Sequence, residues 1–275
     1  MRFVVLLACA ALLASAAAPR AQDTGTSHEA PYIPSPRSTV DEMLRLGAVS
    51  ASDVVYDLGA GDGRVVIEAA RKFGARGVGI ERDPKLVALS RTNAERAGVA
   101  DRVRFVQQDL FQTDLGPATV ITLYLSPNLN LRLRPALLKL KPGTRIVSHA
   151  SDFGDWKPDR ASAIRKDVRV WLVPAVVAGR WSGTAGSRAL QIDFSQRYQQ
   201  ISADAVLGGA RAQVWEATLE SERVRFVIVD ALDSEDEAGL YFEGFVKGNV
   251  IEGSVARGVG TARRAETWRV DRKGS

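Results

Sequence analysis

The sequence predicts an α/β fold in which a doubly wound parallel sheet is followed by a smaller antiparallel β module. Two patterns support this prediction. From residue 38 to residue 178, apolar strand-like runs alternate with segments of helical length, which indicates parallel strands joined by right-handed crossovers and covered on both faces. From residue 179 to residue 275, apolar residues recur at every second position between glycine-bearing turns, which is typical of antiparallel strands.

The composition is that of a folded protein. The 275 residues are 45% hydrophobic and 25% charged, which excludes disorder over the whole length. The formal net charge is +5, and the arginines are spread along the chain instead of gathered in one run. We therefore expect no nucleic-acid partner.

Residues 1–21 have the pattern of a secretory signal peptide. Arg2 provides a basic start, an apolar run of roughly 15 residues follows, and small residues come after it. We expect export, to the periplasm, or retention at the membrane by an uncleaved anchor. Cys9 is the only cysteine and lies in this segment, so the mature chain would contain no disulfide and no thiolate metal site, and we expect no metal. Lipidation of Cys9 is an alternative.

The next residues introduce the α/β domain. Residues 22–37 are rich in proline, serine and threonine, which predicts a loop. Thr39 and Glu42 have the spacing of a capping box, so we expect a helix to begin there and to end at Gly47.

Five strands and three further helices follow in alternation. The strands are predicted from apolar runs at residues 53–59, 76–81, 102–109, 118–125 and 144–150. The helices are predicted at residues 64–74, 84–98 and 129–143. Gly74 and Gly98 would end the first two, and Pro84 would begin the second.

The antiparallel module is predicted at residues 179–275. Its clearest strands are residues 189–198, 224–232, 240–246 and 250–256. Gly248 and Asn249 separate the last two and indicate a hairpin. The stretch "GRWSG" around Trp181 resembles the opening of a lipocalin-type barrel, although a tryptophan that fills a small core explains it equally simply.

Three glycines follow the first strand at alternate positions: Gly59, Gly61 and Gly63. Glycine allows a sharp turn and a close approach of a ligand to the backbone, and the helix that follows offers unpaired N–H groups. A nucleotide-like ligand is therefore expected here. Dinucleotide binders need G-x-G-x-x-G, but Arg64 stands where the third glycine of that motif belongs.

The pattern G-x-G-x-G preceded by Asp57 resembles motif I of the class I S-adenosylmethionine-dependent methyltransferases. The resemblance implies that S-adenosylmethionine is the cofactor and that the glycine loop packs beside its amino-acid portion. It also implies roles for two acids that end the next strands. Glu81 would accept hydrogen bonds from the ribose hydroxyls, and Asp109 would meet the adenine amino group while Leu110 borders the ring.

Three further stretches narrow the resemblance. "PYIPSP", "LYLSPNLNLRLRPAL" and "DFGDWKPD" are similar to the protein-lysine methyltransferases related to those that modify mitochondrial adenine-nucleotide translocase and the ATP-synthase c-subunit, and to their bacterial relatives. The similarity implies a protein substrate, including membrane-associated ones, and transfer to a lysine amine.

The same resemblance suggests where the acceptor binds. Tyr32 and Pro34 would form a lid or line an acceptor channel, the alternative being a proline-stiffened linker. Tyr124, Ser126 and Asn128 stand where many amino-group methyltransferases carry an Asp/Asn-Pro-Pro-aromatic signature. Because that signature is absent, methylation of a nucleobase or of glutamine is disfavoured.

Methyl transfer requires positioning more than acid–base chemistry. We expect Tyr124 and Asp152 to orient the amine, and Trp156 to line its aliphatic stem. His149 is either a base or, more simply, a structural residue at a strand end. Two other functions remain open: a small-molecule methyltransferase capped by the β module, and a non-catalytic envelope binding protein. Export conflicts with a cytosolic cofactor.

Overall fold

The structure, a computed structural model, describes residues 33–229, 239–257 and 265–274. The predicted signal peptide, Cys9 and Tyr32 lie outside the described residues.

The first part of the chain forms a seven-stranded sheet in the order β3-β2-β1-β4-β5-β7-β6. The first five strands are parallel, as predicted, and β7 runs antiparallel to β5 and to β6. Its strands are β1 (Val54–Leu58), β2 (Arg76–Glu81), β3 (Val103–Gln107), β4 (Val120–Leu123), β5 (Arg145–His149), β6 (Arg160–Ala161) and β7 (Val168–Leu172).

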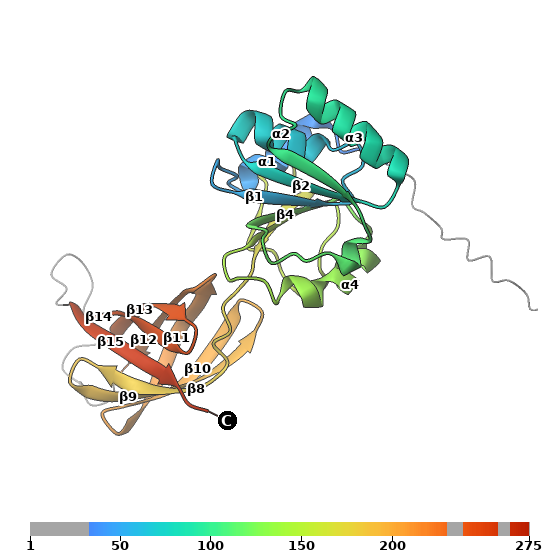
Figure 1. The fold of residues 1–275 in the computed structure, drawn as a ribbon. Coiled ribbons are helices and arrows are strands. Elements are labelled where there is room, and N and C mark those ends of the chain that lie inside the picture. The colour runs from blue at the N-terminus through green and yellow to red at the C-terminus, as the bar shows by residue number, and fades with distance from the viewer. Residues whose placement is uncertain (1–32, 230–238, 258–264, 275) are drawn as a thin grey trace, which may run out of the picture. The chain divides into compact units, whose positions relative to one another are not determined.

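Helices cover both faces of this sheet (Figure 1). Alternate strand residues explain why: Val55 and Val120 pack with α1–α3, whereas Leu58 and Ile121 pack with α4 on the other face. The doubly wound fold is thereby confirmed. The helices are α1 (Arg37–Leu46), α2 (Arg64–Phe73), α3 (Pro84–Arg96), the short 3-10 helix η1 (Leu110–Gln112) and α4 (Pro127–Leu137).

The predicted helix ends agree with the structure at α2 and α3, whereas the helix predicted at residues 129–143 begins at Pro127 and ends at Leu137. Gly74 caps α2 in the left-handed conformation, and Pro84 is the first residue of α3. The predicted capping box is wrong: α1 begins at Arg37 without a side-chain cap. Glu42 bonds to Arg45 and Ser162 instead, because its side chain is buried against the loop before β7.

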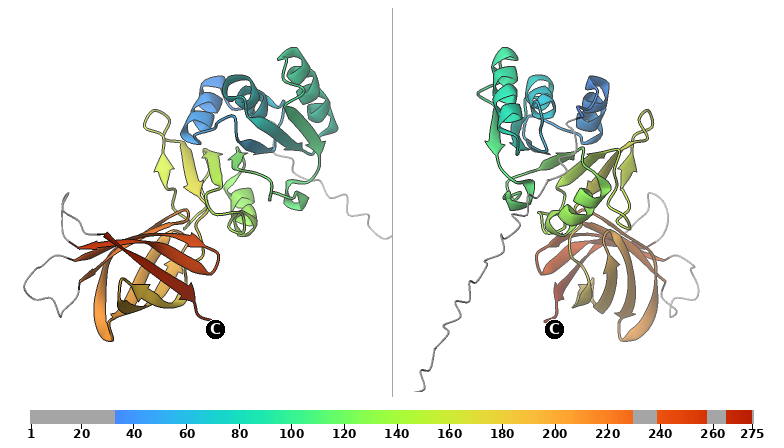
Figure 2. Two further views of the ribbon diagram at one scale, coloured as in Figure 1. Left: turned by 60° about the vertical axis from the view of Figure 1, so that its left-hand side comes forward. Right: turned by 90° about the vertical axis from the view of Figure 1, so that its right-hand side faces the viewer.

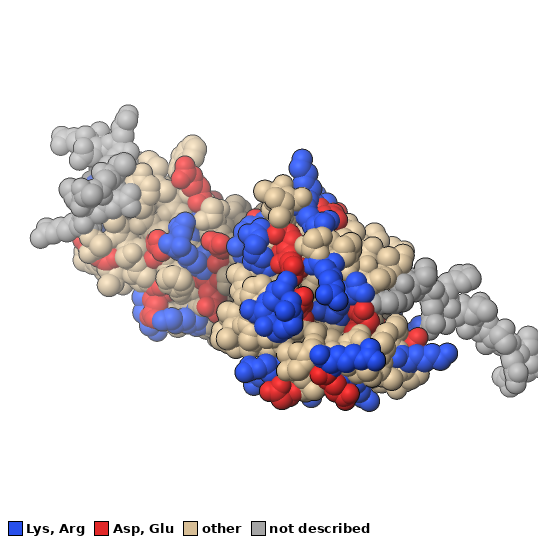
Figure 3. Space-filling view, turned by 90° about the horizontal axis from the view of Figure 1, so that it is seen from above, with Lys and Arg blue, Asp and Glu red and all other residues tan. Residues whose placement is uncertain are grey.

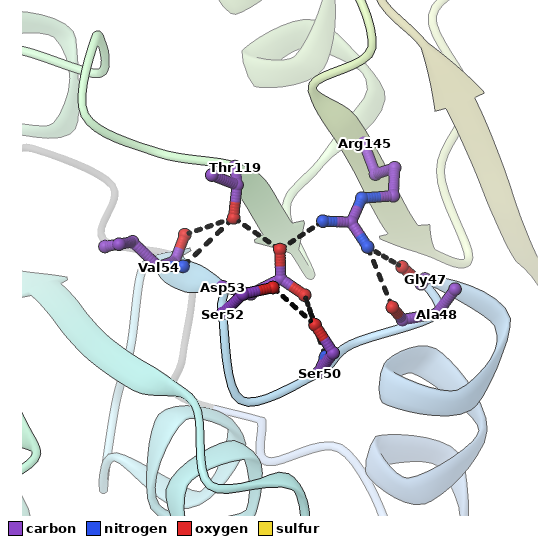
Figure 4. A network of polar contacts seen from close by, with 8 residues as sticks. All are labelled: Gly47, Ala48, Ser50, Ser52, Asp53, Val54, Thr119 and Arg145. Carbon is purple, nitrogen blue, oxygen red and sulfur yellow. Dashed lines mark hydrogen bonds and ion pairs between the residues drawn. The ribbon is translucent and has the colours of Figure 1, made fainter.

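A polar network ties the start of β1 to β5 (Figure 4). Asp53 is buried and forms an ion pair with Arg145, and it also accepts hydrogen bonds from Thr119 and Ser50. Arg145 donates in addition to the carbonyl of Ala48 at 2.8 Å. Burial is the largest single influence on the pKa of Asp53 and raises it, but the bonds from Thr119, Arg145 and Ser50 together lower that pKa.

The second part forms a closed antiparallel barrel in the order β10-β11-β12-β13-β14-β15-β8-β9 (Figure 2). The predicted antiparallel module is thus confirmed, and β9 pairs with β8 on one side and with β10 on the other. Its strands are β8 (Gly179–Ala185), β9 (Arg188–Arg197), β10 (Gln200–Leu207), β11 (Ala210–Glu220), β12 (Arg223–Val229), β13 (Leu240–Lys247), β14 (Val250–Arg257) and β15 (Ala265–Arg272).

Aromatic side chains fill the barrel. The rings of Phe226 and Phe242 stack with centroids 4.7 Å apart, and Trp268 meets both edge-on. Trp181 is fully buried, and its indole nitrogen donates to the carbonyl of Val177 at 2.7 Å, so this tryptophan is a core residue. In the part of the chain that the structure describes, no helix has both the length and the apolar character that crossing a membrane requires.

Candidate functional site

The chain turns from β1 into α2 through a loop whose three glycines have left-handed backbone conformations. Gly59, Gly61 and Gly63 have φ angles of +82°, +54° and +81°, which other residues rarely adopt. A Cβ atom on Gly63 would also lie 2.6 Å from Cζ of Phe105 in β3. The third glycine therefore allows close packing of the start of α2 against the sheet.

Glu81, at the end of β2, is joined to this loop. Its Oε2 accepts a hydrogen bond from the backbone amide of Gly61 at 2.9 Å. Its Oε1 accepts from the amides of Arg82 and Asp83 at 2.8 and 3.0 Å. The carboxylate is thus held by three backbone groups, and the residue is half-buried at the end of β2.

Asp57 lies at the end of β1, directly before the loop, and is buried. Burial, together with the smaller effects of the charges of Glu81 and Asp62, raises the pKa of Asp57 to about 7, against the hydrogen bond that Thr122 donates at 2.7 Å. Asp57 therefore takes up a proton near neutral pH.

Asp109 follows β3 and begins η1. Its Oδ1 accepts from the amide of Phe111 at 2.9 Å, and the residue is exposed. Leu110 and Phe111 are half-buried, and the guanidinium of Arg132 in α4 lies 4.0 Å from the centre of the Phe111 ring. An acid and an apolar surface thus lie next to each other beyond the end of β3.

These groups match the chemistry of S-adenosylmethionine, the cofactor that the sequence predicts. The ribose hydroxyls and the adenine amino group are hydrogen-bond donors, and Glu81 and Asp109 supply carboxylate acceptors at the ends of the neighbouring strands β2 and β3. The amino-acid carboxylate is an acceptor, and the start of α2 supplies backbone N–H donors. The contacts of individual residues with the cofactor stay predictions.

The predicted acceptor residues follow β4 and β5. Tyr124, Ser126, Asn128 and Asp152 are all exposed, and Pro34, before α1, is exposed as well. Tyr124 packs on His149, with ring centroids 4.1 Å apart, whereas no hydrogen bond joins Tyr124 to Asp152 among the residues described here. Their roles toward an acceptor also stay predictions.

Trp156 requires a correction. Its side chain is fully buried between Phe153, Trp171 and Tyr198, so it does not line an open channel for the stem of a lysine. The sequence misleads here because a tryptophan beside charged residues at the end of a sheet is typical of both binding surfaces and aromatic cores.

The structure also brings forward residues that sequence reasoning did not place in the site. The hydroxyl of Ser35 forms a hydrogen bond with His149. The backbone carbonyl of Ser35 accepts a hydrogen bond from Arg64, the first residue of α2. Only the position of Ser35 inside "PYIPSP" marked it in the sequence.

The chain is similar to proteins of known activity. The family model of the ANTKMT methyltransferase domain matches residues 57–160. A protein-lysine N-methyltransferase of Saccharolobus islandicus (strain REY15A) is 43% identical over 130 residues, which cover 46% of this chain and 81% of that protein. The adenine nucleotide translocase lysine N-methyltransferase of Mus musculus is 33% identical over 145 residues, which cover 52% of this chain and only 62% of the relative's length.

A solved structure is also similar. It is described as an RNA methyltransferase from Salinibacter ruber in complex with S-adenosyl-L-homocysteine, is 54% identical in sequence and has a TM-score of 0.51. The match covers 53% of this chain and 96% of that one.

Proposed function

Because the chain belongs to the S-adenosylmethionine-dependent methyltransferases of the protein-lysine N-methyltransferase family, we propose that its methyl acceptor is the side-chain amine of a protein lysine. The observation that carries the proposal is the glycine loop bonded to Glu81, in a chain 43% identical to a lysine methyltransferase. When bound, S-adenosylmethionine would supply an electrophilic methyl group for in-line displacement by a nucleophile, with S-adenosylhomocysteine as the leaving group.

The protein's part on the cofactor side is to bind and orient. Glu81 is held in place by the amides of Gly61, Arg82 and Asp83, and its remaining lone pairs would accept hydrogen bonds from the ribose hydroxyls. Because the acid is already ordered by the backbone, binding costs little side-chain entropy.

On the acceptor side, the lysine must arrive as a neutral amine. A nearby positive charge and partial burial both lower the pKa of a lysine, so no dedicated base is required. Asp152 would accept a hydrogen bond from the amine, and Tyr124, whose ring is backed by His149, would set its direction. Positioning of this kind supplies about 7–11 kcal/mol of barrier reduction in well-oriented systems.

RNA is the second candidate acceptor, because the Salinibacter ruber protein is described as an RNA methyltransferase. Two observations favour lysine. The stretch after β4 reads Tyr124-Leu125-Ser126-Pro127 and lacks the Asp/Asn-Pro-Pro-aromatic signature. Figure 3 shows acidic side chains among the basic ones on one face, and ion pairs such as Lys72 with Asp41 reduce the charge available to a phosphate backbone.

The acceptor class is tested by labelling an extract of the source cells. Purified protein and methyl-labelled S-adenosylmethionine are incubated with soluble protein, solubilised membrane protein, RNA and metabolites, kept as separate fractions. We expect label on methylated lysine in a protein fraction, identified by mass spectrometry, and strongly reduced label with Glu81→Gln. Label confined to RNA or to small molecules overturns the lysine proposal, and absence of label from every fraction contradicts catalysis.

We propose in addition that the chain is exported or held at the membrane. The support is the pattern of residues 1–21, a basic start followed by an apolar run and small residues. Sequencing of the N-terminus of protein isolated from the cell envelope tests this proposal. We expect a mature end at about residue 22, and recovery of the intact chain in the cytosol would contradict it.

A further inference from the structure

Ser35 and His149 lie 114 positions apart in the sequence, yet their side chains touch. Oγ of Ser35, in the segment before α1, is 3.0 Å from Nδ1 of His149, the last residue of β5. Both residues are buried, with exposures of 5% and 7%. The other ring nitrogen, Nε2, lies 3.1 Å from Oδ2 of Asp167 in the loop before β7.

The partners determine which nitrogen carries the proton. An ionised carboxylate only accepts, so Nε2 of His149 donates to Asp167, and Nδ1 of the neutral ring accepts from the hydroxyl of Ser35. Burial lowers the pKa of His149, against the opposing effect of Asp167, which favours the neutral ring at pH 7. Because both nitrogens are engaged, His149 has no free lone pair to serve as the base for an amine.

Contacts extend from this pair in two directions. On one side, the ring of His149 packs on Tyr124 with centroids 4.1 Å apart and an interplanar angle of 33°. On the other side, the carbonyl of Ser35 accepts from Nη1 of Arg64 at 2.7 Å, and Arg64 directly follows Gly63 of the glycine loop. Ser35 and His149 thus connect the cofactor loop to the predicted acceptor residue.

The backbone next to His149 is also fixed by specific contacts. Ala150 has a φ of +67°, which is unfavourable for alanine, and its amide donates to the carbonyl of Asp167 at 2.7 Å. Residues kept in such a conformation are typical of places where surrounding contacts fix a functional geometry.

We propose that Ser35, His149 and Asp167 form a positioning unit, which fixes the ring of Tyr124 and anchors the residues directly before α1. The unit rests on the proposed function in that Tyr124 orients the acceptor. It acts through Tyr124 and not by contact with the cofactor. Its loss should therefore slow transfer to the acceptor and leave cofactor binding unchanged.

Kinetics separate these effects. In Ser35→Ala we expect kcat/KM for the acceptor to fall about tenfold, as for loss of a buried hydrogen bond, with an unchanged Kd for S-adenosylmethionine by calorimetry. Ser35→Thr, which keeps the hydroxyl, should recover most of the rate. Ser52→Ala is the control, since it removes an exposed serine hydroxyl that, among the described residues, bonds to Ser50 alone, at the far end of β1.

A second pair of variants protects the test against misfolding of Ser35→Ala. The side chain of Asp167 is 47% exposed, so Asp167→Ala and Asp167→Asn should both fold. Asn keeps an acceptor for Nε2–H and should retain more activity than Ala. Equal, wild-type rates in Ser35→Ala and in both Asp167 variants would overturn the positioning role.

Nitrogen NMR of the imidazole tests the geometry without any acceptor. The chain has two histidines, so His28→Gln leaves His149 as the only signal. We expect a neutral ring protonated on Nε2 at pH 7 and a changed Nδ1 chemical shift in Ser35→Ala. A ring protonated on Nδ1 would overturn the proposed unit.

The lysine proposal and the positioning proposal can fail separately. If the extract assay labels an acceptor other than lysine, the lysine proposal fails. The Ser35 and Asp167 variants, measured on that other acceptor, still decide the role of the unit.

Discussion

The backbone amide of Gly61 donates a hydrogen bond of 2.9 Å to Oε2 of Glu81, across 20 positions of sequence. The loop after β1 and the acid at the end of β2 are therefore one structural unit. A change in either residue disturbs the other, because the bend at Gly61, with its φ of +54°, aims the amide at the carboxylate. Affinity for the cofactor should depend on both residues.

Glu81→Gln should weaken binding of S-adenosylmethionine by roughly 10- to 100-fold, because hydrogen bonds to a charged acceptor contribute about 1.5–3 kcal/mol. Isothermal titration calorimetry measures this effect. Glu95→Gln, an exposed position on α3, is the matched control and should bind as the wild type does. Equal affinities of Glu81→Gln and Glu95→Gln for S-adenosylmethionine would show that Glu81 does not contribute to cofactor binding.

Gly63→Ala should destabilise the fold more than Gly98→Ala does. Both glycines have positive φ angles, +81° and +68°, so the backbone strain is similar. A Cβ at Gly63 would lie 2.6 Å from Phe105, whereas nothing lies within 4 Å of one at Gly98. Urea unfolding should show about 1–3 kcal/mol of additional loss for Gly63→Ala, and equal losses would show that packing there is relaxed.

Asp57 should make stability fall as the pH rises. Its pKa is about 7 in the folded protein and starts from 3.8, so the folded state binds the proton more tightly. This stabilisation is fully present below the unfolded pKa and is lost as the pH rises through the folded pKa. Asp57→Asn, which still accepts from Thr122, should gain stability relative to the wild type between pH 5 and pH 8, on the order of a few kcal/mol. The titration of His149 affects the wild type and Asp57→Asn equally, so it drops out of the difference between their unfolding free energies. If that difference does not change with pH, Asp57 does not titrate in this range.

Asp53→Ala should cost about 3 kcal/mol of unfolding free energy, because it leaves the guanidinium of Arg145 without its partner in a partly buried site. Asp101→Ala, at an exposed turn, is the control. The network lies at the opposite end of β1 from the glycine loop, so the Kd for S-adenosylmethionine should not change. A large change in that Kd would mean that the two ends of the strand are coupled.

The sequence predicts the sheet well because each parallel strand leaves its own local pattern. The runs around Val55, Ile80 and Ile121 are apolar enough to be buried on both faces, and glycines or prolines mark the helices between them. The sequence does not predict β6 and β7. β6 is an edge strand of only two residues, too short to leave a pattern, and β7 is placed between β5 and β6 by antiparallel pairing with segments that only the folded chain brings to it. Closure of the barrel likewise depends on pairing of β15 with β8, far apart in sequence.

The sequence predicts those parts of the site whose residue pattern has few structural explanations. Three glycines and a following acid indicate a cofactor loop, and the Gly61–Glu81 bond agrees with that interpretation. Trp156 and Ser35 were not predictable, because a tryptophan or a serine has the same sequence context on a surface and in a core. Their surroundings, Trp171 for one and His149 for the other, come from strands that only the folded chain brings together.

The most direct test is calorimetric titration of S-adenosylmethionine into the wild type, Gly61→Val and the control Gly248→Val. Both glycines have positive φ angles, +54° and +62°, that valine adopts only with strain, and Gly248 lies in the hairpin between β13 and β14. We predict stoichiometric binding by the wild type and by Gly248→Val, and loss of measurable binding in a folded Gly61→Val. Undiminished affinity in Gly61→Val would contradict a cofactor seated on the glycine loop.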